Sequence, residues 1–184
     1  MASKPLVLAV FASDRGAGDA ERSSIMTQAG MYFARHGASI ICVAENGVIP
    51  VPLVTAARSA GGSVRIIADA SIALPRALEG VPMEVLAETP ERLGRVAALA
   101  DALVALPGSL ASASALFGAW SASKASGKAI PVVMLNRHRA FDVMRGYAAD
   151  VLSPGLPGHE RAVQFADSVE DAWNRVSRLA QDRH

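Results

Sequence analysis

The residues best suited to bind a ligand follow a short apolar run of the sequence. Pro107, Gly108 and Ser109 come directly after the run 102–106, and Ser112 follows in a stretch with helical spacing. The N–H groups at a helix N-terminus, together with serine hydroxyls, can hold a phosphate or a carboxylate. The same residues can equally form an ordinary N-cap, because no complete glycine fingerprint accompanies this turn. Both interpretations stay open on the sequence alone.

Four further loops follow apolar runs in the same way. They are 13–16, 45–47, 68–69 and 136–139. The carboxyl ends of parallel strands meet at one edge of a sheet, where ligands bind in α/β proteins. We therefore expect one binding crevice at this edge. Its candidate ligand-binding residues are Ser13, Asp14, Glu45, Asn46, Gly47, Pro107, Gly108, Ser109, Ser112 and Asn136.

Arg92 is the candidate cation for an anionic ligand. It lies in the first turns of a predicted helix that precedes the run 102–106, so its side chain can reach the same crevice. A guanidinium binds an anion through two parallel N–H groups. The alternative is an ordinary surface arginine. The basic stretch 137–139 adds positive charge to this rim, although basic residues after a strand usually form a solvated loop.

The histidines and the single cysteine do not suggest a metal centre. The four histidines are scattered, without helical pairing or a nearby cysteine. They are His36, His138, His159 and His184. Cys42 lies in an apolar run, which predicts a small buried strand residue rather than a redox thiol. We expect no metal ion, no disulfide within the chain and no bound cofactor.

The composition favours one folded domain over residues 1–184. The chain is 51% hydrophobic and 19% charged, so it has ample apolar material for a core and too few charges for a disordered protein. Its net charge of +1 gives no electrostatic footprint for nucleic acid or an anionic membrane. The apolar stretch 6–12 is too short for a signal peptide or a membrane span. We expect a cytoplasmic protein with a small-molecule or protein partner.

Short apolar runs alternate with helical patterns along the chain. The runs are 6–11, 40–44, 64–67, 102–106 and 132–135. Continuous apolar runs are typical of parallel strands that are covered on both faces. The alternation predicts an α/β fold: a doubly wound, Rossmann-like, mostly parallel sheet with helices on both faces, in three layers.

The helices have recognisable ends. One is expected around Ile25 to Phe33, with a stop at His36-Gly37, and another ahead of Gly61-Gly62. A third begins with Thr89 as the cap, and a fourth uses Leu110, Ala113, Phe117 and Trp120 as its buried face. The last is capped by Ser168, after a Pro/Gly-rich loop at 153–158 and a short terminal strand.

The segment 100–108 resembles a family signature. Its sequence, ADALVALPG, resembles the ADA-hydrophobic-ALPGG signature of the Lonely Guy family, which is often labelled lysine decarboxylase-like. The resemblance extends along nearly the whole chain. It includes Val10-Phe11, the stretch 60–64, Trp120, Gly127-Lys128, Leu135-Asn136 and Phe141-Asp142. It implies a Rossmann-like fold, a homodimer and phosphoribohydrolase activity on nucleoside 5′-monophosphates. Related proteins on the same fold bind molybdenum cofactor.

This chain departs from the family pattern at the catalytic positions. The pattern Pro-Gly-Gly-x-Gly-Thr-x-x-Glu falls on residues 107–115, so Ala115 stands at the position of the glutamate. Cleavage of an N-glycosidic bond develops oxocarbenium character and needs a carboxylate. Of the family's Arg-Lys pair, the arginine is kept as Arg92 and the lysine is replaced by Leu93. Arg92 is therefore the one catalytic position that the resemblance retains.

Two other loops of the family pattern are also altered. The glycine-rich loop falls near residues 43–50, where most glycines are gone and Glu45 adds a negative charge. Glycines let the backbone approach a phosphate, so their replacement should block and repel one. The Gly-Ser-Ser of the first loop is replaced by Ser13-Asp14-Arg15.

Three hypotheses follow. The favoured one is a divergent, non-catalytic Lonely Guy-like protein that binds a nucleotide, a phosphosugar or another small anionic ligand, or a partner. The second is a hydrolase of N-glycosyl bonds with a rebuilt site, in which Asp14, Glu45 or Asp69 supplies the carboxylate. An acid within hydrogen-bond reach of Arg92 would support it, and a crevice filled by Leu110, Ile49 and Val48 would count against it. The third is an interaction protein whose Ala/Ser-rich helix, 109–126, packs against a copy of itself.

Overall fold

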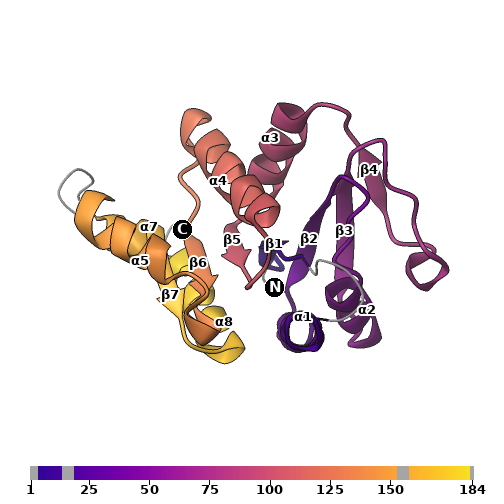
Figure 1. Ribbon diagram of the computed structural model, residues 1–184, viewed down its shortest axis with the longest axis horizontal. Helices are drawn as coiled ribbons and strands as arrows, with labels where there is room; N and C mark the ends of the chain where they lie inside the picture. The colour runs from indigo at the N-terminus through magenta and orange to yellow at the C-terminus, as the bar shows by residue number, and fades with distance from the viewer. Residues whose placement is uncertain (1–3, 14–18, 153–157, 183–184) are drawn as a thin grey trace.

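One parallel sheet organises the molecule. The computed structural model describes residues 4–13, 19–152 and 158–182, and within them seven parallel strands lie in the order β4-β3-β2-β1-β5-β6-β7 (Figure 1). The strands are β1 Val7–Phe11, β2 Ser39–Ala44, β3 Ser63–Ala68, β4 Met83–Val85, β5 Ala102–Ala105, β6 Val132–Leu135 and β7 Val163–Ala166. The predicted α/β class and three-layer architecture are confirmed.

Helices cover both faces of this sheet (Figure 1). The helices are α1 Ala20–Arg35, α2 Val51–Ser59, α3 Thr89–Leu99, α4 Leu110–Ala125, α5 Asp142–Tyr147, α7 His159–Ala162 and α8 Val169–Gln181. Shorter turns are η1 Arg76–Leu78, η2 Arg137–Arg139 and the π-helical η3 Ala148–Leu152. Helices α1, α2 and α8 pack on one face, and α3 and α4 pack on the other. None of the described helices is long and apolar enough to cross a membrane.

Side chains along each strand alternate between the two faces of the sheet, and each face has its own hydrophobic core. In β1, Leu8 and Val10 join the core under α1, α2 and α8, whereas Ala9 and Phe11 join the core under α3 and α4. Successive side chains of a strand point to opposite faces, so a strand buried on both sides must be apolar throughout. Cys42 lies in the first core, where burial raises the pKa of its thiol to about 12, as expected for a structural rather than a redox residue.

The direction of strand addition reverses between β1 and β5. From β1 the chain adds β2, β3 and β4 on one side, and it then returns to add β5, β6 and β7 on the other side. The loops that leave the carboxyl ends of β1 and β5 therefore run to helices on opposite faces of the sheet. Ligands bind in the crevice that such a switch point leaves.

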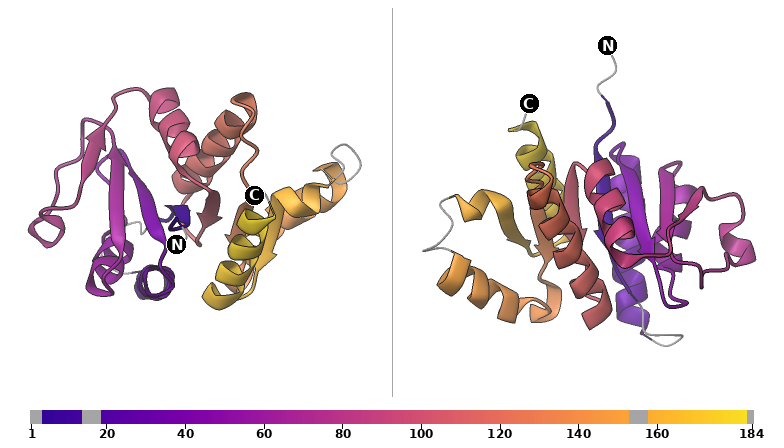
Figure 2. Two further views of the ribbon diagram at one scale, coloured as in Figure 1. Left: turned by 180° about the vertical axis from the view of Figure 1, so that it is seen from behind. Right: turned by 90° about the horizontal axis from the view of Figure 1, so that it is seen from above.

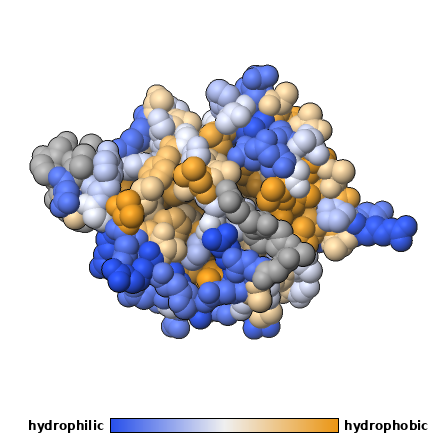
Figure 3. Space-filling model, viewed as in Figure 1, coloured by the Kyte–Doolittle hydropathy of each residue, from blue (hydrophilic) through white to orange (hydrophobic). Residues whose placement is uncertain are grey.

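Helix α5 lies at the end of the sheet that carries β6 and β7. Figure 2 shows it in orange at that end of the molecule in both views. Its exposed side includes Val143 and Tyr147. Figure 3 shows hydrophobic surface over α4 and near the middle of this face, and hydrophilic surface along the edge where α1 and α8 lie. Part of the apolar surface thus lies on the side of the sheet that carries α4.

The sequence expectations on strands and helix ends were largely confirmed, with two errors. The five apolar runs form β1, β2, β3, β5 and β6, the first helix ends before Gly37 at φ 81°, and Ser168 caps α8. Thr89 is not the cap of α3, because the N-cap is Glu88 and Thr89 is already helical. Leu110 does not belong to the buried face of α4, since it is 80% exposed and the buried positions include Ala115 and Leu116.

Helices α1 and α2 approach each other at Gly30. A Cβ atom at this position would lie 2.4 Å from the carbonyl oxygen of Leu53 and 3.2 Å from the amide nitrogen of Ala57. Both contacts are with backbone, which cannot rotate away as a flexible side chain can. The absence of a side chain at Gly30 therefore sets the spacing of these two helices.

We expect Gly30→Ala to lower the free energy of unfolding by about 1–3 kcal/mol through overpacking. Gly94→Ala is the matched control, because Gly94 is also helical and a Cβ there meets nothing within 4 Å. This control should raise stability by about 0.5–1 kcal/mol through helix propensity. Urea unfolding followed by circular dichroism measures both. Equal effects of the two substitutions would contradict the close approach of α1 and α2.

Candidate functional site

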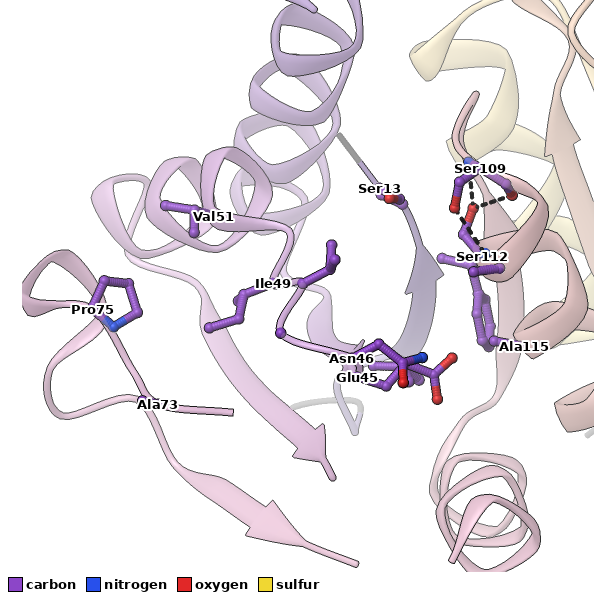
Figure 4. Close-up of a pocket in the computed structure, with 16 residues that line it drawn as sticks. Ser13, Glu45, Asn46, Ile49, Val51, Ala73, Pro75, Ser109, Ser112 and Ala115 are labelled. Carbon is purple, nitrogen blue, oxygen red and sulfur yellow. Dashed lines mark hydrogen bonds between the residues drawn. The ribbon is translucent and has the colours of Figure 1, made fainter. Parts of the chain in front are cut away.

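A cavity of about 680 Å³ opens at the carboxyl ends of β1 and β2 (Figure 4). We call it the main cavity. Its lining residues are Phe11, Ala12, Ser13, Val43, Glu45, Asn46, Gly47, Val48, Ile49, Val51, Ala73, Pro75, Ser109, Ala111, Ser112 and Ala115. In Figure 4, Ser109, Ser112 and Ala115 of the α4 segment face Ile49, Ala73 and Pro75 across the space. The site thus joins loops from both sides of the switch point.

The first turn of α4 forms one wall of the main cavity. Ser109 is the N-cap: its hydroxyl accepts a hydrogen bond from the N–H of Ser112 at 3.2 Å, and its own N–H donates to Ser112 Oγ at 3.0 Å. This reciprocal capping box uses two of the N–H groups that a helix start leaves without intrahelical acceptors. Among the residues that the structure describes, the N–H groups of Leu110 and Ala111 have no acceptor, so they remain as donors for a ligand. The N-cap interpretation is correct, and it leaves an anion site possible.

A tight turn after β2 forms the opposite edge. Glu45 and Val48 pair through two backbone hydrogen bonds, of 3.2 and 3.0 Å, and both residues between them have positive φ. Asn46 and Gly47 are the residue types that tolerate this conformation, and Asn-Gly is a strong signal for such a hairpin turn. The glycine-rich phosphate loop expected from the family pattern is therefore replaced by a compact turn.

Asp69 fixes this turn from the end of β3. Its carboxylate accepts hydrogen bonds from the N–H of Asn46 at 2.9 Å and from the hydroxyl of Ser71 at 2.5 Å, and Ser71 Oγ in turn accepts from the N–H of Gly47 at 3.0 Å. The Ser71 hydroxyl and then the Asn46 N–H hold the pKa of the Asp69 carboxyl below its ordinary value. Asp69 is thus committed to the turn as an ionised acceptor.

Arg92 lies behind the main cavity and does not line it. Its side chain is only 4% exposed, so the surface-arginine interpretation is wrong. Nη1 donates to the carbonyl oxygens of Leu86 and Ala87, at 2.8 and 2.6 Å. Nη2 donates to Glu45 Oε2 at 3.1 Å and to Thr89 Oγ1 at 3.0 Å. Four donor contacts to protein atoms hold the guanidinium in place.

Glu45 is the one charged side chain among the described residues that line the main cavity. Its ion pair with Arg92 offsets this charge, so the negative field that would repel an anion is reduced. This contact also meets the condition for the rebuilt-enzyme hypothesis, since an acid lies within hydrogen-bond reach of Arg92. Val48 and Ile49 contribute to the lining, but the cavity stays open and Leu110 does not fill it.

The structure brings together six of the ten predicted ligand-binding residues. Ser13, Glu45, Asn46, Gly47, Ser109 and Ser112 line the main cavity. Pro107 and Gly108 lie on the other side of the α4 N-terminus, in a second cavity. Asp14 is outside the described residues. Asn136 lines neither cavity.

Asn136 organises the loop after β6. Its amide nitrogen donates to Asp142 Oδ1 at 2.8 Å, and its amide oxygen accepts from the N–H of Phe141 at 2.7 Å. The next residues include two left-handed positions, His138 and Arg139, both with exposed side chains. His138 Nε2 lies 2.5 Å from a carboxylate oxygen of Glu21 in α1. The polar groups of Asn136 are thus used inside the protein.

Sequence reasoning missed part of the apolar wall of the main cavity, because it considered Val48 and Ile49 for the crevice but none of the other wall residues. This wall comprises Val48, Ile49, Val51, Ala73 and Pro75. The residues lie after β2 and in the long connection from β3 to β4, and that connection carries no periodic pattern. The Asn-Gly pair was the available signal for a hairpin turn at 45–48. Asp69 and Ser71, at the start of that connection, join the two loops by accepting hydrogen bonds from the N–H groups of Asn46 and Gly47.

Comparisons with known proteins agree on the fold. No protein-family model and no curated protein matches the sequence. Among solved structures, the molybdenum cofactor carrier protein of Chlamydomonas reinhardtii matches with a TM-score of 0.71 and 18% identity, covering 97% of this chain and 99% of that chain. The molybdenum cofactor binding protein of the phototrophic bacterium Rippkaea orientalis matches with a TM-score of 0.68 and 15% identity, with the same coverage.

A third solved structure, the structural-genomics target TM1055, matches with a TM-score of 0.63 and 19% identity, covering 95% of this chain and 99% of that chain. At these identities the likeness establishes the arrangement of strands and helices. The chain therefore shares its three-layer α/β fold, over almost its whole length, with proteins that include two described as binding or carrying molybdenum cofactor.

Proposed function

We propose that this protein binds a small anionic ligand in the main cavity without cleaving it. The observation that carries this proposal is that an apolar wall and the N–H groups of Leu110 and Ala111, which have no acceptor within the described part of the chain, border one open cavity. Helix N-termini favour anions through these N–H groups and the helix dipole. Apolar pockets with a few convergent polar groups are the usual form of small-molecule sites.

The volume and the lining of the main cavity suit a ring that carries an anionic group. Its volume of about 680 Å³ falls in the range of roughly 300–1,000 Å³ that is usual for small-molecule sites. Val48, Ile49 and Pro75 offer apolar surface for the ring, and Ser13 and Asn46 offer polar groups at its edge. A phosphate would bind beside the first turn of α4. Nucleotides, phosphosugars and pterin phosphates share this chemistry in whole or in part.

Hydrolysis is not supported by the residues around the cavity. Ala115 lies on the wall where the resembled family would place a glutamate, and its methyl group can neither position water nor stabilise an oxocarbenium ion. Arg92 is buried and donates to four protein oxygens. We therefore assign Arg92 a structural role, and we propose ligand binding rather than hydrolysis as the function of the site.

The fold neighbours favour one ligand class. Two of them are described as a carrier and a binding protein of molybdenum cofactor, which is a pterin with a phosphate group. The apolar wall and the free N–H groups of α4 fit such a ligand as cargo. We therefore place pterin phosphates first among candidate ligands and nucleoside monophosphates second.

A rebuilt hydrolase is the second candidate function. The 3.1 Å contact between Glu45 Oε2 and Arg92 Nη2 favours it, because it places an acidic side chain at the cavity edge within hydrogen-bond reach of a guanidinium. Glu45 would then act as the catalytic carboxylate on a nucleoside monophosphate. The same contact also holds Glu45 against the protein, which favours a positioning role for this pair.

Ligand binding should raise the melting temperature of the protein. A ligand that binds only the folded state stabilises it by about 2.7 kcal/mol at a hundred-fold excess over its dissociation constant. We expect a saturable shift with molybdopterin, AMP or a sugar phosphate. Ala111→Trp should abolish the shift, because it places an indole on the wall of the main cavity.

Ala125→Trp is the control for that experiment, since Ala125 is exposed at the opposite end of α4 and lines neither cavity. It should leave the shift intact. A shift of equal size in both variants would place the ligand outside the main cavity. If none of these ligands changed the melting temperature, the result would favour the hypothesis of an interaction protein over ligand binding.

Incubation with AMP or other nucleoside monophosphates should release no free base. The reason is the methyl group at Ala115 in the place of an acid. Chromatographic detection of adenine measures the reaction. Release of adenine that Glu45→Gln abolishes, in a variant that unfolds like the unchanged protein, would establish the rebuilt hydrolase instead.

We also propose that the chain forms a homodimer in the cytoplasm. Helix α4 supports this, because small side chains at Ser114 and Ser121, which line neither cavity, are exposed along it, and small side chains allow helices to approach closely. Light scattering at micromolar concentration should give twice the chain mass. The mass of a single chain would contradict the dimer and weaken the interaction hypothesis.

A further inference from the structure

A second cavity of about 370 Å³ lies beside the same helix N-terminus. Its lining includes Pro107, Gly108 and Leu110 from the β5–α4 segment, and Phe141 and Val143 from the segment after β6. The proposed ligand in the main cavity makes no use of this space. The second cavity therefore needs its own explanation.

The two cavities share a common wall. Phe11, Ser109 and Ser112 line both of them, so the capping box of α4 stands between the two spaces. Of the two N–H groups that the capping box leaves free, one belongs to Leu110, which lines the second cavity, and the other to Ala111, which lines the main cavity. One anionic group at this turn is thus within reach of both cavities.

The strand order places the cavities on opposite sides of the switch point. The main cavity includes Phe11 of β1 and Val43 of β2, whereas the second cavity includes Ala105 of β5 and Ala140 after β6. Doubly wound sheets bind dinucleotides across such a reversal, with one half of the ligand on each side. In this chain, one cavity lies on each side of the reversal, and the helix N-terminus between them is that of α4, which follows β5.

We propose that the two cavities hold the two halves of one ligand, in which two ring-bearing groups are joined by a pyrophosphate at the first turn of α4. This inference rests on the proposed function and narrows it from mononucleotide-type to dinucleotide-type ligands. The pyrophosphate lies over the N–H groups of Leu110 and Ala111. One ring occupies each cavity.

Each cavity has one charged side chain in its lining, counted over the described residues, and each of these is already paired. Arg22 lines the second cavity, where its Nε lies 3.0 Å from Asp19 Oδ2. Glu45 lines the main cavity, where its Oε2 lies 3.1 Å from Arg92 Nη2. The side-chain charges therefore favour neither cavity, and the anionic group of the ligand depends on the N–H groups at the start of α4.

Two large apolar side chains of the second cavity are exposed to solvent. Leu110 is 80% exposed and Val143 is 82% exposed, although both are large aliphatic residues. A flat ring between them removes apolar surface from water, which is favourable. Gly108 lies at the same place, where an added Cβ would lie 2.5 Å from Ser112 Oγ and 3.3 Å from the N–H nitrogen of Ser13. Glycine lets the two loops approach at the junction.

Calorimetric titration with paired probes tests the inference. The pairs are molybdopterin with molybdopterin guanine dinucleotide, and AMP with NAD⁺. At least one dinucleotide should bind tighter than its mononucleotide partner by about ten-fold or more. Ala113→Trp, which fills the second cavity, should reduce the affinity of the dinucleotide to that of the mononucleotide and leave mononucleotide affinity unchanged.

Val143→Glu provides a second variant that cannot disturb the core, because Val143 is 82% exposed. It should weaken the dinucleotide alone, through repulsion of the pyrophosphate and loss of apolar contact. Equal affinities within each pair, or an equal loss of both affinities in Ala113→Trp, would overturn the two-cavity inference while leaving the proposed function intact. No binding of any probe to the unchanged protein would overturn both.

Discussion

Arg92 connects the edge of the main cavity to the segment that leads into α3. Its guanidinium donates to two carbonyl oxygens, to Thr89 and to Glu45, and its side chain is buried. A buried cation is tolerated only when its charge and its N–H groups are satisfied, and removal of one partner costs about 3–5 kcal/mol. The Nε–H of Arg92 lacks a partner among the described residues, so the four contacts of Nη1 and Nη2 are the ones that compensate the burial of this cation. Glu45 is therefore held in place, and with it the turn that borders the cavity.

The contact between Arg92 and Glu45 is compatible with ligand binding but leaves neither side chain available for catalysis. A hydrolase of N-glycosidic bonds needs a free acid and a cation directed at the substrate. Here Ala115 offers a methyl group, and the arginine and the glutamate at the edge of the cavity contact each other. What remains available to a ligand is the start of α4, where a capping box of two serines satisfies two N–H groups and leaves two. Helix amides can hold an anion without any charged side chain.

Much of the fold could be predicted from the sequence, and less of the site. Five strands could be predicted from apolar runs, because a strand that is buried on both faces has no polar position. Strand β4 is only Met83–Val85, too short for any run to show, and Leu110 was misplaced because α4 is apolar or small on every side. The loops after β1, β2 and β5 were predicted to meet, since carboxyl ends of parallel strands must. Two features of the site depend on how loops that are distant in the sequence pack together, and no local sequence pattern predicts such packing. They are the ion pair between Glu45 and Arg92 and the part of the cavity wall formed by Ala73 and Pro75.

The central claim is that the amides at the start of α4, rather than arginine side chains, hold an anion beside the cavity. Nuclear magnetic resonance of the ¹⁵N-labelled protein during titration with molybdopterin measures this residue by residue. We expect the amide signals of Leu110 and Ala111 to shift together and to saturate, while those of the basic turn from Arg137 to Arg139 stay in place. Saturable shifts confined to that basic turn, with α4 unaffected, would contradict the account.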